Sequence, residues 1–389
     1  MISGYIPYGK HNITESDINA VINVLKSDFL TQGSLVAKFE ESVCKYVDSK
    51  FSTSTNSATS ALHIACIALG LDKDDWLWTS PNSFVASANC GLYCGARIDF
   101  VDIDPKTYNM CVDSLEQKLA KAKKGGKLPK IVVPVHFAGQ SCDMAKIYEL
   151  SKKYSFKIIE DASHAIGGKY LDKLIGNCEY SDITVFSFHP VKIITTAEGG
   201  MATTNSKELF EKMQMLRSHY ITRDQKKMTG KSEGDWYYQQ IGLGFNYRIT
   251  ELQAALGISQ IQRIDKFISK RHYLKERYDS LLDKLPIIKP YQYKDNYSAL
   301  HLYPIQLCTR KSSKDRAYVF NKLVKNNIGV NVHYIPIHRQ PYYENLGFKK
   351  GDFPNAEQYY NNAISLPLFY DMTDKQQDKV VKVITDALS

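Results

Sequence analysis

Residues Ser187–Met201 read SFHPVKIITTAEGGM and contain one lysine, Lys192, in a turn rich in hydroxyl and small side chains. This turn follows the short apolar run Ile183–Phe186, which predicts a strand buried on both faces. Asp161 comes after the apolar run Phe156–Glu160 in the same way. Open α/β sheets bind their ligands at the carboxyl ends of their strands, so both side chains are expected at such a site.

An amine and a carboxylate in these positions suggest a particular cofactor. A lysine amine that condenses with an aldehyde and a carboxylate that pairs with a protonated pyridine are the two groups that an enzyme using pyridoxal 5'-phosphate needs. Each residue alone has an ordinary explanation. Lys192 could be a surface lysine, and Asp161 could be a helix N-cap.

Two further segments favour the cofactor. Residues 56–62, NSATSAL, place small and hydroxyl residues at the start of an apolar helix, where free amides and the helix dipole make an anion site. The hydroxyl of Ser187 can bind the same phosphate. Phe84 lies in a turn-rich segment and can cover a flat pyridine ring. An ordinary N-cap and ordinary core packing remain the alternatives for these segments.

Composition permits a globular enzyme of this kind. The chain has 389 residues, 43% hydrophobic and 23% charged, which predicts one large domain and a smaller one. The net charge of +9 comes from scattered lysines, so most are expected on solvated faces, and some could attract a phosphorylated ligand. No basic–aromatic motif indicates nucleic acid as a partner.

The eight cysteines predict neither disulfides nor a metal centre. Cys90 and Cys94 form the only near pair, and no second pair completes a metal site. Several cysteines lie in apolar runs, which favours reduced thiols in a cytoplasmic protein. The N-terminal residues do not resemble a secretory signal, and no apolar run is long enough to span a membrane.

Strand and helix patterns alternate through the first two thirds of the chain, as in a mostly parallel sheet with helices on both sides. Residues Glu15–Leu25 are predicted to form a helix capped by Thr14, with Ile18, Val21, Ile22 and Leu25 on one face. A second apolar helix is predicted over Ser57–Leu69 and a third over Met144–Tyr154. The predicted strands are Arg97–Val101, Ile131–Val135, Phe156–Glu160 and Ile183–Phe186.

The pattern changes near residue 250, which we take as a domain boundary. Residues 1–250 are predicted to form the large cofactor-binding domain, N-terminal segment included, and residues 251–389 a connecting helix and a small C-terminal α+β domain. Residues Tyr220–Gln240 are polar and aromatic and predict a long loop. The elements expected after it are a long helix over Ile249–Tyr278, strands Ala299–Leu307 and Val330–Tyr334, and helices Lys314–Asn326 and Asp374–Leu388.

Four motifs together resemble one family. They are TSPxxF at Thr79–Phe84, EDASHAIGG at Glu160–Gly168, the lysine motif quoted above, and GFNYR at Gly244–Arg248. The chain resembles the DegT/DnrJ/EryC1/StrS family of sugar aminotransferases from about Ile6 to its C-terminus. The resemblance implies an α/β chain with the type I aminotransferase fold, namely a large, mostly parallel mixed-sheet domain and a smaller C-terminal α+β domain, in a homodimer. Residues Trp76–Pro81 and Phe84–Cys90 look like the pseudaminic-acid branch of that family.

The resemblance also assigns roles to residues around the cofactor. It implies that Lys192 condenses with the cofactor aldehyde and that Asp161 keeps the pyridine nitrogen protonated. Phe84 would stack on the ring, His164 would lie beside it, and Glu198 would lie near the lysine loop. The phosphate would be held by Ala58, Thr59 and Ser187, and by Asn246 of the neighbouring subunit.

Substrate contacts are less clearly marked. The family places Leu30, Thr31, Arg248 and the pair His333–Tyr334 near the nucleotide sugar, although the last two would also suit an ordinary strand. Two departures from the family pattern are visible. Ala197 stands where glycine is common and is expected to need a negative φ. Asn82 and Ser83 differ from the commonest pair in their turn.

The implied reaction is a ping-pong transamination in which L-glutamate donates the amino group and Lys192 moves the proton. For the pseudaminic-acid branch, the acceptor is C4 of a UDP-4-keto-6-deoxy-N-acetylhexosamine. Amination at C3 or of another epimer remains an alternative, because the same motifs serve both. A relative that removes a hydroxyl would carry histidine in place of Lys192. A non-enzymatic regulatory protein on the same fold is a further alternative.

Overall fold

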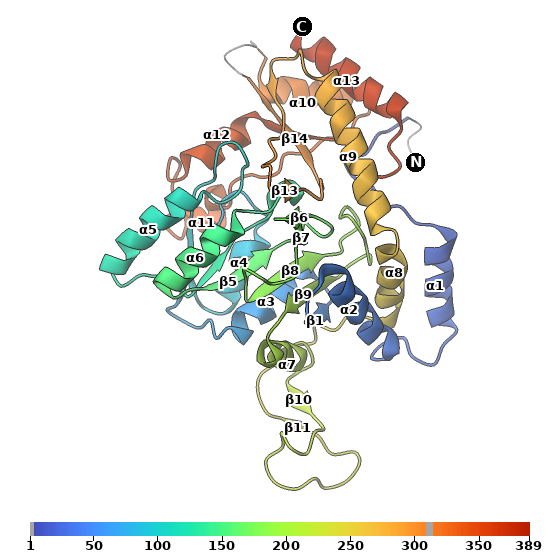
Figure 1. Ribbon diagram of the computed structural model, residues 1–389, viewed down its shortest axis with the longest axis vertical. Helices are drawn as coiled ribbons and strands as arrows, with labels where there is room; N and C mark the ends of the chain where they lie inside the picture. The colour runs from blue at the N-terminus through green and yellow to red at the C-terminus, as the bar shows by residue number, and fades with distance from the viewer. Residues whose placement is uncertain (1–3, 309–313) are drawn as a thin grey trace.

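The computed structural model describes residues 4–308 and 314–389 and centres on a seven-stranded sheet (Figure 1). Its spatial order is β1-β9-β8-β5-β4-β2-β3. Strands β3, β2, β4, β5 and β8 run parallel, and β9 is antiparallel to both of its neighbours. The strands are β1 (Phe51–Thr55), β2 (Trp76–Thr79), β3 (Arg97–Phe100), β4 (Ile131–Val133), β5 (Lys157–Asp161), β8 (Ile183–Ser187) and β9 (Gly200–Thr204).

Helices cover both faces of the sheet because alternate strand residues point to opposite sides. Ile131, Val133 and Ile159 pack in one core with α3 (Ala58–Ala68) and α4 (Ala86–Tyr93). Val132 and Ile158 pack in another with α5 (Val112–Lys124) and α6 (Met144–Tyr154). These two layers confirm the expected α/β class.

A third core packs the carboxyl end of β8 against long helices. Phe186 and Phe188 pack with α2 (Ser34–Val47), α8 (Glu251–Ile261) and α9 (Ile264–Leu281). The single helix predicted over Ile249–Tyr278 is therefore wrong, since two helices occupy that range. The chain turns between them at Arg263, whose guanidinium hydrogen-bonds Asn12 and pairs with Asp17.

The C-terminal part has its own apolar core between α9, α10, α13 and a three-stranded sheet of order β12-β14-β15. Ile6, which the sequence placed with the large domain, packs in this core. The prediction of a strand over Val330–Tyr334 is wrong: only an isolated bridge from Asn331 to Ser365 forms there. The elements are β12 (Ile287–Ile288), β14 (Tyr303–Leu307), α10 (Arg316–Lys325), α11 (Pro341–Glu344), α12 (Pro354–Asn362), β15 (Ala363–Leu366) and α13 (Asp374–Leu388).

An arm projects from the body below α7 (Lys207–Leu216), within the predicted loop Tyr220–Gln240 (Figure 1). Its base is a short antiparallel pair, β10 (Ile221–Thr222) and β11 (Gln239–Gln240). Beyond that pair the arm carries the exposed side chain of Trp236, and Leu243 follows it, also exposed. Another small sheet has the order β13-β6-β7, formed by β6 (Lys169–Tyr170), β7 (Lys173–Leu174) and β13 (Asn296–Tyr297).

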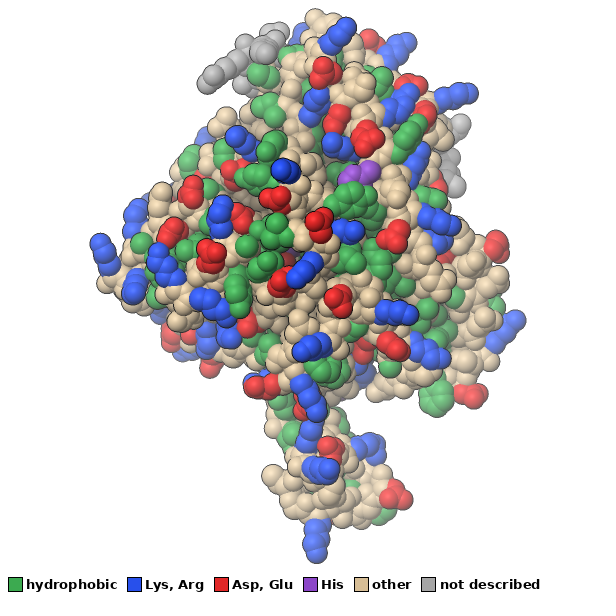
Figure 2. All heavy atoms as spheres, viewed as in Figure 1, with side chains coloured by type: hydrophobic (Ala, Val, Ile, Leu, Met, Phe, Trp, Pro, Cys, Tyr) green, Lys and Arg blue, Asp and Glu red, His purple; other side chains and the backbone are tan. Residues whose placement is uncertain are grey.

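Helix α1 (Glu15–Leu25) has the predicted bounds and begins after Thr14, whose amide donates to the Asp17 carboxylate. Its predicted apolar face is largely exposed, since Ile18 is 42% exposed and Leu25 is 59% exposed, whereas Val24 is buried. The surface otherwise mixes charges of both signs, and Figure 2 shows Lys and Arg side chains spread over one face. The scattered lysines therefore form no single basic groove on that face.

Candidate active site

A cavity of about 970 Å³ opens where β5 and β8 end, which is large enough for a cofactor and a small substrate together. It brings together nine of the thirteen residues that the sequence singled out for cofactor and substrate. These are Ala58, Thr59, Phe84, Asp161, His164, Ser187, Lys192, His333 and Tyr334. Glu198, which the resemblance placed near the lysine loop, also lines the cavity.

Asp161 ends β5 and is held in one orientation by three donors. The Ser87 hydroxyl donates to Oδ2 at 2.6 Å, and the hydroxyl and amide of Ser163 donate to Oδ1 at 2.6 and 3.1 Å. Ser83 lies 2.7 Å from the Ser87 oxygen, so its hydroxyl completes the chain by donating to Ser87. Asp161 as a whole is only 5% exposed, and its hydrogen bonds fix the carboxylate before any ligand enters.

Lys192 lies in the loop between β8 and β9. Its amide donates to the His189 carbonyl at 2.9 Å, and the Thr196 amide donates to the Phe188 carbonyl at 2.9 Å, which closes the loop. Burial lowers the pKa of the Lys192 amine to about 8, while the nearby Asp161 carboxylate opposes this change. A neutral amine is a nucleophile, so this side chain is prepared to attack a carbonyl carbon near neutral pH.

The turn after Lys192 differs from the sequence-based expectation. Ala197 has φ 66, so the expected negative φ is wrong. The Thr195 hydroxyl accepts the Ala197 amide at 2.9 Å and stabilises this left-handed conformation. Gly200 follows closely, and a Cβ there would lie 2.5 Å from the Ala58 amide nitrogen. Glycine is therefore required where β9 passes the start of α3.

The N-terminus of α3 faces the cavity with unused donors. The amides of Ala58 and Thr59 come before the first intrahelical bond, from the Ala61 amide to the Ser57 carbonyl. Ser187 is buried on the same wall, and its hydroxyl has no hydrogen-bond partner among residues 4–308 and 314–389. These donors fit a phosphate group, and their role in binding one stays a prediction.

Aromatic side chains form another part of the cavity wall. Phe84 lines the cavity and is nevertheless 60% exposed, so its ring is open to stack on a ligand. His164 Nδ1 accepts the Ala138 amide at 3.3 Å, which leaves the proton of the neutral ring on Nε2. Nε2 lies 3.1 Å from Tyr334 Oη, so His164 donates to Tyr334.

This arrangement orients the Tyr334 hydroxyl. Because its oxygen accepts from His164, its own proton can point into the cavity. Burial raises the pKa of Tyr334, so the hydroxyl remains a donor. His333 Nδ1 lies 2.8 Å from the Ser365 hydroxyl, and burial lowers the pKa of His333 to about 3. Both histidines are therefore neutral, since burial and the Lys192 charge also lower the pKa of His164.

Four residues predicted from the sequence lie outside this cavity, in a second cluster around the N-terminus of α8. The Glu251 amide donates to the Leu30 carbonyl at 3.0 Å, and Thr31 forms a bridge with Thr250. Arg248 donates to the Ser218 hydroxyl at 3.1 Å. Asn246 is the fourth member of this cluster; it is exposed and forms an isolated β-bridge with Ser218.

The sequence analysis missed two residues that contribute to the cavity. The Ser87 hydroxyl donates a hydrogen bond to the Asp161 carboxylate. Ser87 follows Ser83 by four residues, and this spacing could have predicted the contact between the two hydroxyls. His301 lines the cavity, with its ring 4.4 Å from that of His164. Nothing in the sequence around His301 marked it.

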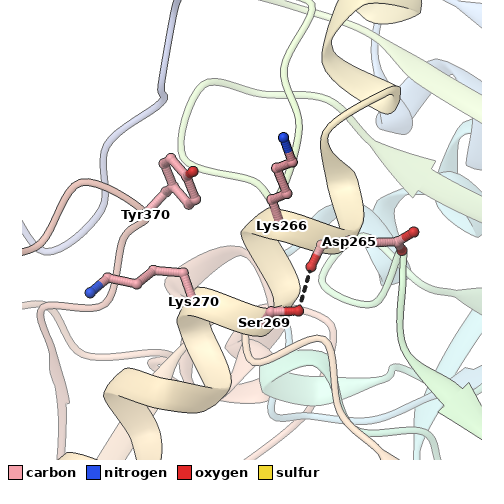
Figure 3. A pocket seen from close by; sticks show the side chains of 5 residues that line it. All are labelled: Asp265, Lys266, Ser269, Lys270 and Tyr370. Atoms are coloured by element: carbon pink, nitrogen blue, oxygen red, sulfur yellow. Dashed lines mark hydrogen bonds between the residues drawn. The ribbon is translucent and has the colours of Figure 1, made fainter.

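Another pocket, of about 700 Å³, lies between α2 and the helices α8 and α9, and it contains none of the predicted residues. A shallow pocket of about 580 Å³ lies on α9 and is lined by Asp265, Lys266, Ser269, Lys270 and Tyr370 (Figure 3). The Ser269 hydroxyl donates to the Asp265 carbonyl at 2.8 Å. This pocket also contains none of the predicted residues. Among residues 4–308 and 314–389, no group of three or more His, Cys, Asp or Glu could hold a metal ion. In the same ranges, no helix is long and apolar enough to cross a membrane.

Comparisons with known proteins agree with this geometry. Residues 11–385 match the DegT/DnrJ/EryC1/StrS aminotransferase family. A Campylobacter jejuni protein named UDP-4-amino-4,6-dideoxy-N-acetyl-beta-L-altrosamine transaminase is 38% identical over 384 residues, which cover 98% of this chain and 96% of that one.

Solved structures show the same fold. The structure of Helicobacter pylori PseC, described as an aminotransferase involved in the biosynthesis of pseudoaminic acid, superposes with a TM-score of 0.90 at 31% identity, over 99% of each chain. The PLP-form of a putative sugar aminotransferase, Spr1654 from Streptococcus pneumoniae, gives a TM-score of 0.89 at 28% identity, over 99% of this chain and 100% of that one. The chain therefore belongs to the DegT/DnrJ/EryC1/StrS aminotransferase family and is a PLP-dependent sugar aminotransferase.

Proposed function

We propose that the protein transfers an amino group from L-glutamate to C4 of a UDP-4-keto-6-deoxy-N-acetylhexosamine, for surface glycans of the pseudaminic-acid type. The observation that carries the proposal is the convergence of Lys192, Asp161 and the α3 N-terminus on one cavity. The names of the Campylobacter jejuni relative and the Helicobacter pylori neighbour support the choice of sugar.

The cofactor in this proposal is pyridoxal 5'-phosphate, bound by this chain's own residues. The α3 amides of Ala58 and Thr59 and the Ser187 hydroxyl would hold its phosphate, and Phe84 would stack on its ring. Its pyridine system supplies an electron sink for the carbon that loses a proton. Asp161, anchored by Ser87 and Ser163, would pair with the ring nitrogen and keep it charged.

Lys192 carries out the proton transfers. An amine whose pKa is about 8 exists in both protonation states near neutral pH, so it can accept a proton and return it. It is tethered in the same cavity as Asp161, and this proximity replaces a collision with an external base. The neutral His164 and the oriented Tyr334 hydroxyl donate hydrogen bonds without adding charge beside Lys192.

We further propose a homodimer in which each subunit completes the other's site. Leu30, Thr31, Asn246 and Arg248 gather in a second cluster, outside the cavity of their own chain. Arginine and asparagine there suit the phosphate oxygens of a cofactor and of a nucleotide sugar. The exposed apolar side of α1 and the projecting arm provide surfaces that a second copy could cover. The cytoplasmic location stays a prediction that rests on eight unpaired cysteines.

A product analysis tests the proposed reaction. The purified protein is supplied with L-glutamate and a panel of UDP-keto sugars that differ in the position of the ketone, and the products are assigned by NMR and mass spectrometry. We expect a 4-amino product together with 2-oxoglutarate. A 3-amino product would overturn the proposed regiochemistry in favour of the alternative reaction. No product from any sugar, with a colourless protein, would favour the non-enzymatic alternative.

A further inference from the structure

Arg271 is a buried arginine without a carboxylate partner. It lies on α9 and is 2% exposed. Its Nη1 donates to the backbone carbonyls of Leu300, His301 and Leu368 at 3.1, 3.2 and 3.0 Å. Its Nε has no hydrogen-bond partner, and no Asp or Glu among residues 4–308 and 314–389 pairs with the guanidinium. A buried charge is costly unless it is paired, so a counter-ion would stabilise this side chain.

The two other arginines on or next to this helix both have acidic partners. Arg263, just before α9, pairs with Asp17, and Arg277, farther along α9, pairs with Asp378. Their side chains are 20% and 23% exposed, so both are less buried than Arg271. Burial lowers the pKa of Arg271 to about 10, which still leaves the guanidinium charged at neutral pH. The most deeply buried of the three charges is therefore the one that no acidic side chain balances.

A small cavity of about 10 Å³ borders Arg271. Lys10, His11 and Lys192 also line it, and none of the described residues that line it is Asp or Glu. Lys10 and His11 are exposed, so an ion can reach the cavity from the surface. The volume leaves room for one water-sized guest. Chloride is a single atom of nearly that size, whereas phosphate, sulfate and carboxylates extend over several atoms and do not fit.

We propose that the cavity beside Arg271 is a binding site for a halide ion, chloride above all, which balances the buried guanidinium charge. The site is independent of the sugar on which the enzyme acts. Its walls come from parts of the chain that are far apart in sequence: Lys10 and His11 from the N-terminal segment, Lys192 from the lysine loop, and Arg271 from α9. Lys192 lines both this cavity and the large one, so a bound anion would stabilise the loop that presents the reactive amine.

Bromide tests the site directly in the wild-type protein. It carries the charge of chloride and scatters X-rays anomalously, so crystals of the holoenzyme grown in sodium bromide are measured on both sides of the bromine absorption edge. We expect an anomalous peak in contact with the Arg271 guanidinium, between it and the N-terminal segment at Lys10 and His11. A water molecule at this place without an anomalous peak would overturn the proposal. Anomalous peaks confined to exposed lysines elsewhere on the surface would overturn it as well.

Thermal unfolding in solution is the second measurement. Sodium chloride is compared with sodium gluconate at equal ionic strength, because gluconate is too large for the cavity. An anion that binds only the folded protein raises its Tm, and we expect a rise of about 2 °C or more in chloride. Arg277→Met is the matched control on the same helix and should keep this rise. Arg271→Gln retains amide donors for the carbonyls without the charge and should lose it. No rise in the wild-type protein, or an equal rise in Arg271→Gln, would contradict the site, and the anomalous map decides if Arg271→Gln does not fold.

Discussion

Replacing Lys192 with methionine should make the cofactor-free protein more stable at neutral pH. The amine lies in a buried position that its charged form disfavours, and Asp161 offsets only part of that cost. Methionine fills similar space without a charge. Lys192, which is needed for catalysis, would thus lower the free energy of unfolding of the wild-type protein.

The size of the effect follows from the two pKa values. The pKa of lysine falls from 10.5 to about 8 on folding, a difference of about 2.5, and at 1.36 kcal/mol for each pKa unit this amounts to about 3 kcal/mol. Because the amine borders an open cavity, we expect between about 1 and 3 kcal/mol. Between pH 8 and 10.5 the unfolded chain holds a proton that the folded chain has released, so the stability of the wild-type protein rises with pH there. The stability advantage of the Lys192→Met protein is therefore largest below pH 8 and disappears above about pH 10.5.

Thermal unfolding of both cofactor-free proteins, followed from pH 6 to pH 11, measures this difference. Lys266→Met changes an exposed lysine and is the matched control, for which we expect no pH-dependent difference. Two results would refute the claim that burial lowers the pKa of the Lys192 amine. One is equal stability of the wild-type and Lys192→Met proteins at pH 7, and the other is a difference in stability that does not shrink above pH 8.

Three further experiments test the roles of individual residues. Asp161→Ala should bind the cofactor partly but lose turnover by on the order of 10²-fold, because a preorganised charge partner is removed, and near-normal kcat would contradict this role. Phe84→Ala should weaken cofactor binding about fivefold, as the loss of about 1 kcal/mol of stacking implies, in a fluorescence titration. Lys192→Ala and Asn246→Ala proteins, each impaired, should regain activity when mixed, because one site of the mixed dimer carries neither change. No rescue in verified mixed dimers would mean that each subunit builds its own site.

The sequence predicted the centre of the cavity well because local patterns determine it. Apolar runs ending at Glu160 and Phe186 became β5 and β8, and parallel strands bring their carboxyl ends to one edge, so Asp161 and Lys192 meet. The small and hydroxyl residues before α3 face the same edge. These positions depend on strand order and helix direction alone.

Other parts depend on contacts that no local pattern records. Strands β1, FSTST, and β9, GMATT, were not predicted, because their hydroxyl side chains resemble a loop. They are buried as a pair because those hydroxyls find partners: Thr203 donates to the Gly176 carbonyl at 2.9 Å. The break at Arg263 likewise requires the distant Asn12 and Asp17.

Borohydride reduction followed by peptide mapping tests the central claim most directly. We expect the purified protein to be yellow, to lose its visible absorbance on reduction, and to carry the pyridoxyl group on Lys192 alone. A label on another lysine, or no label on a protein supplied with pyridoxal 5'-phosphate, would contradict the assignment of Lys192.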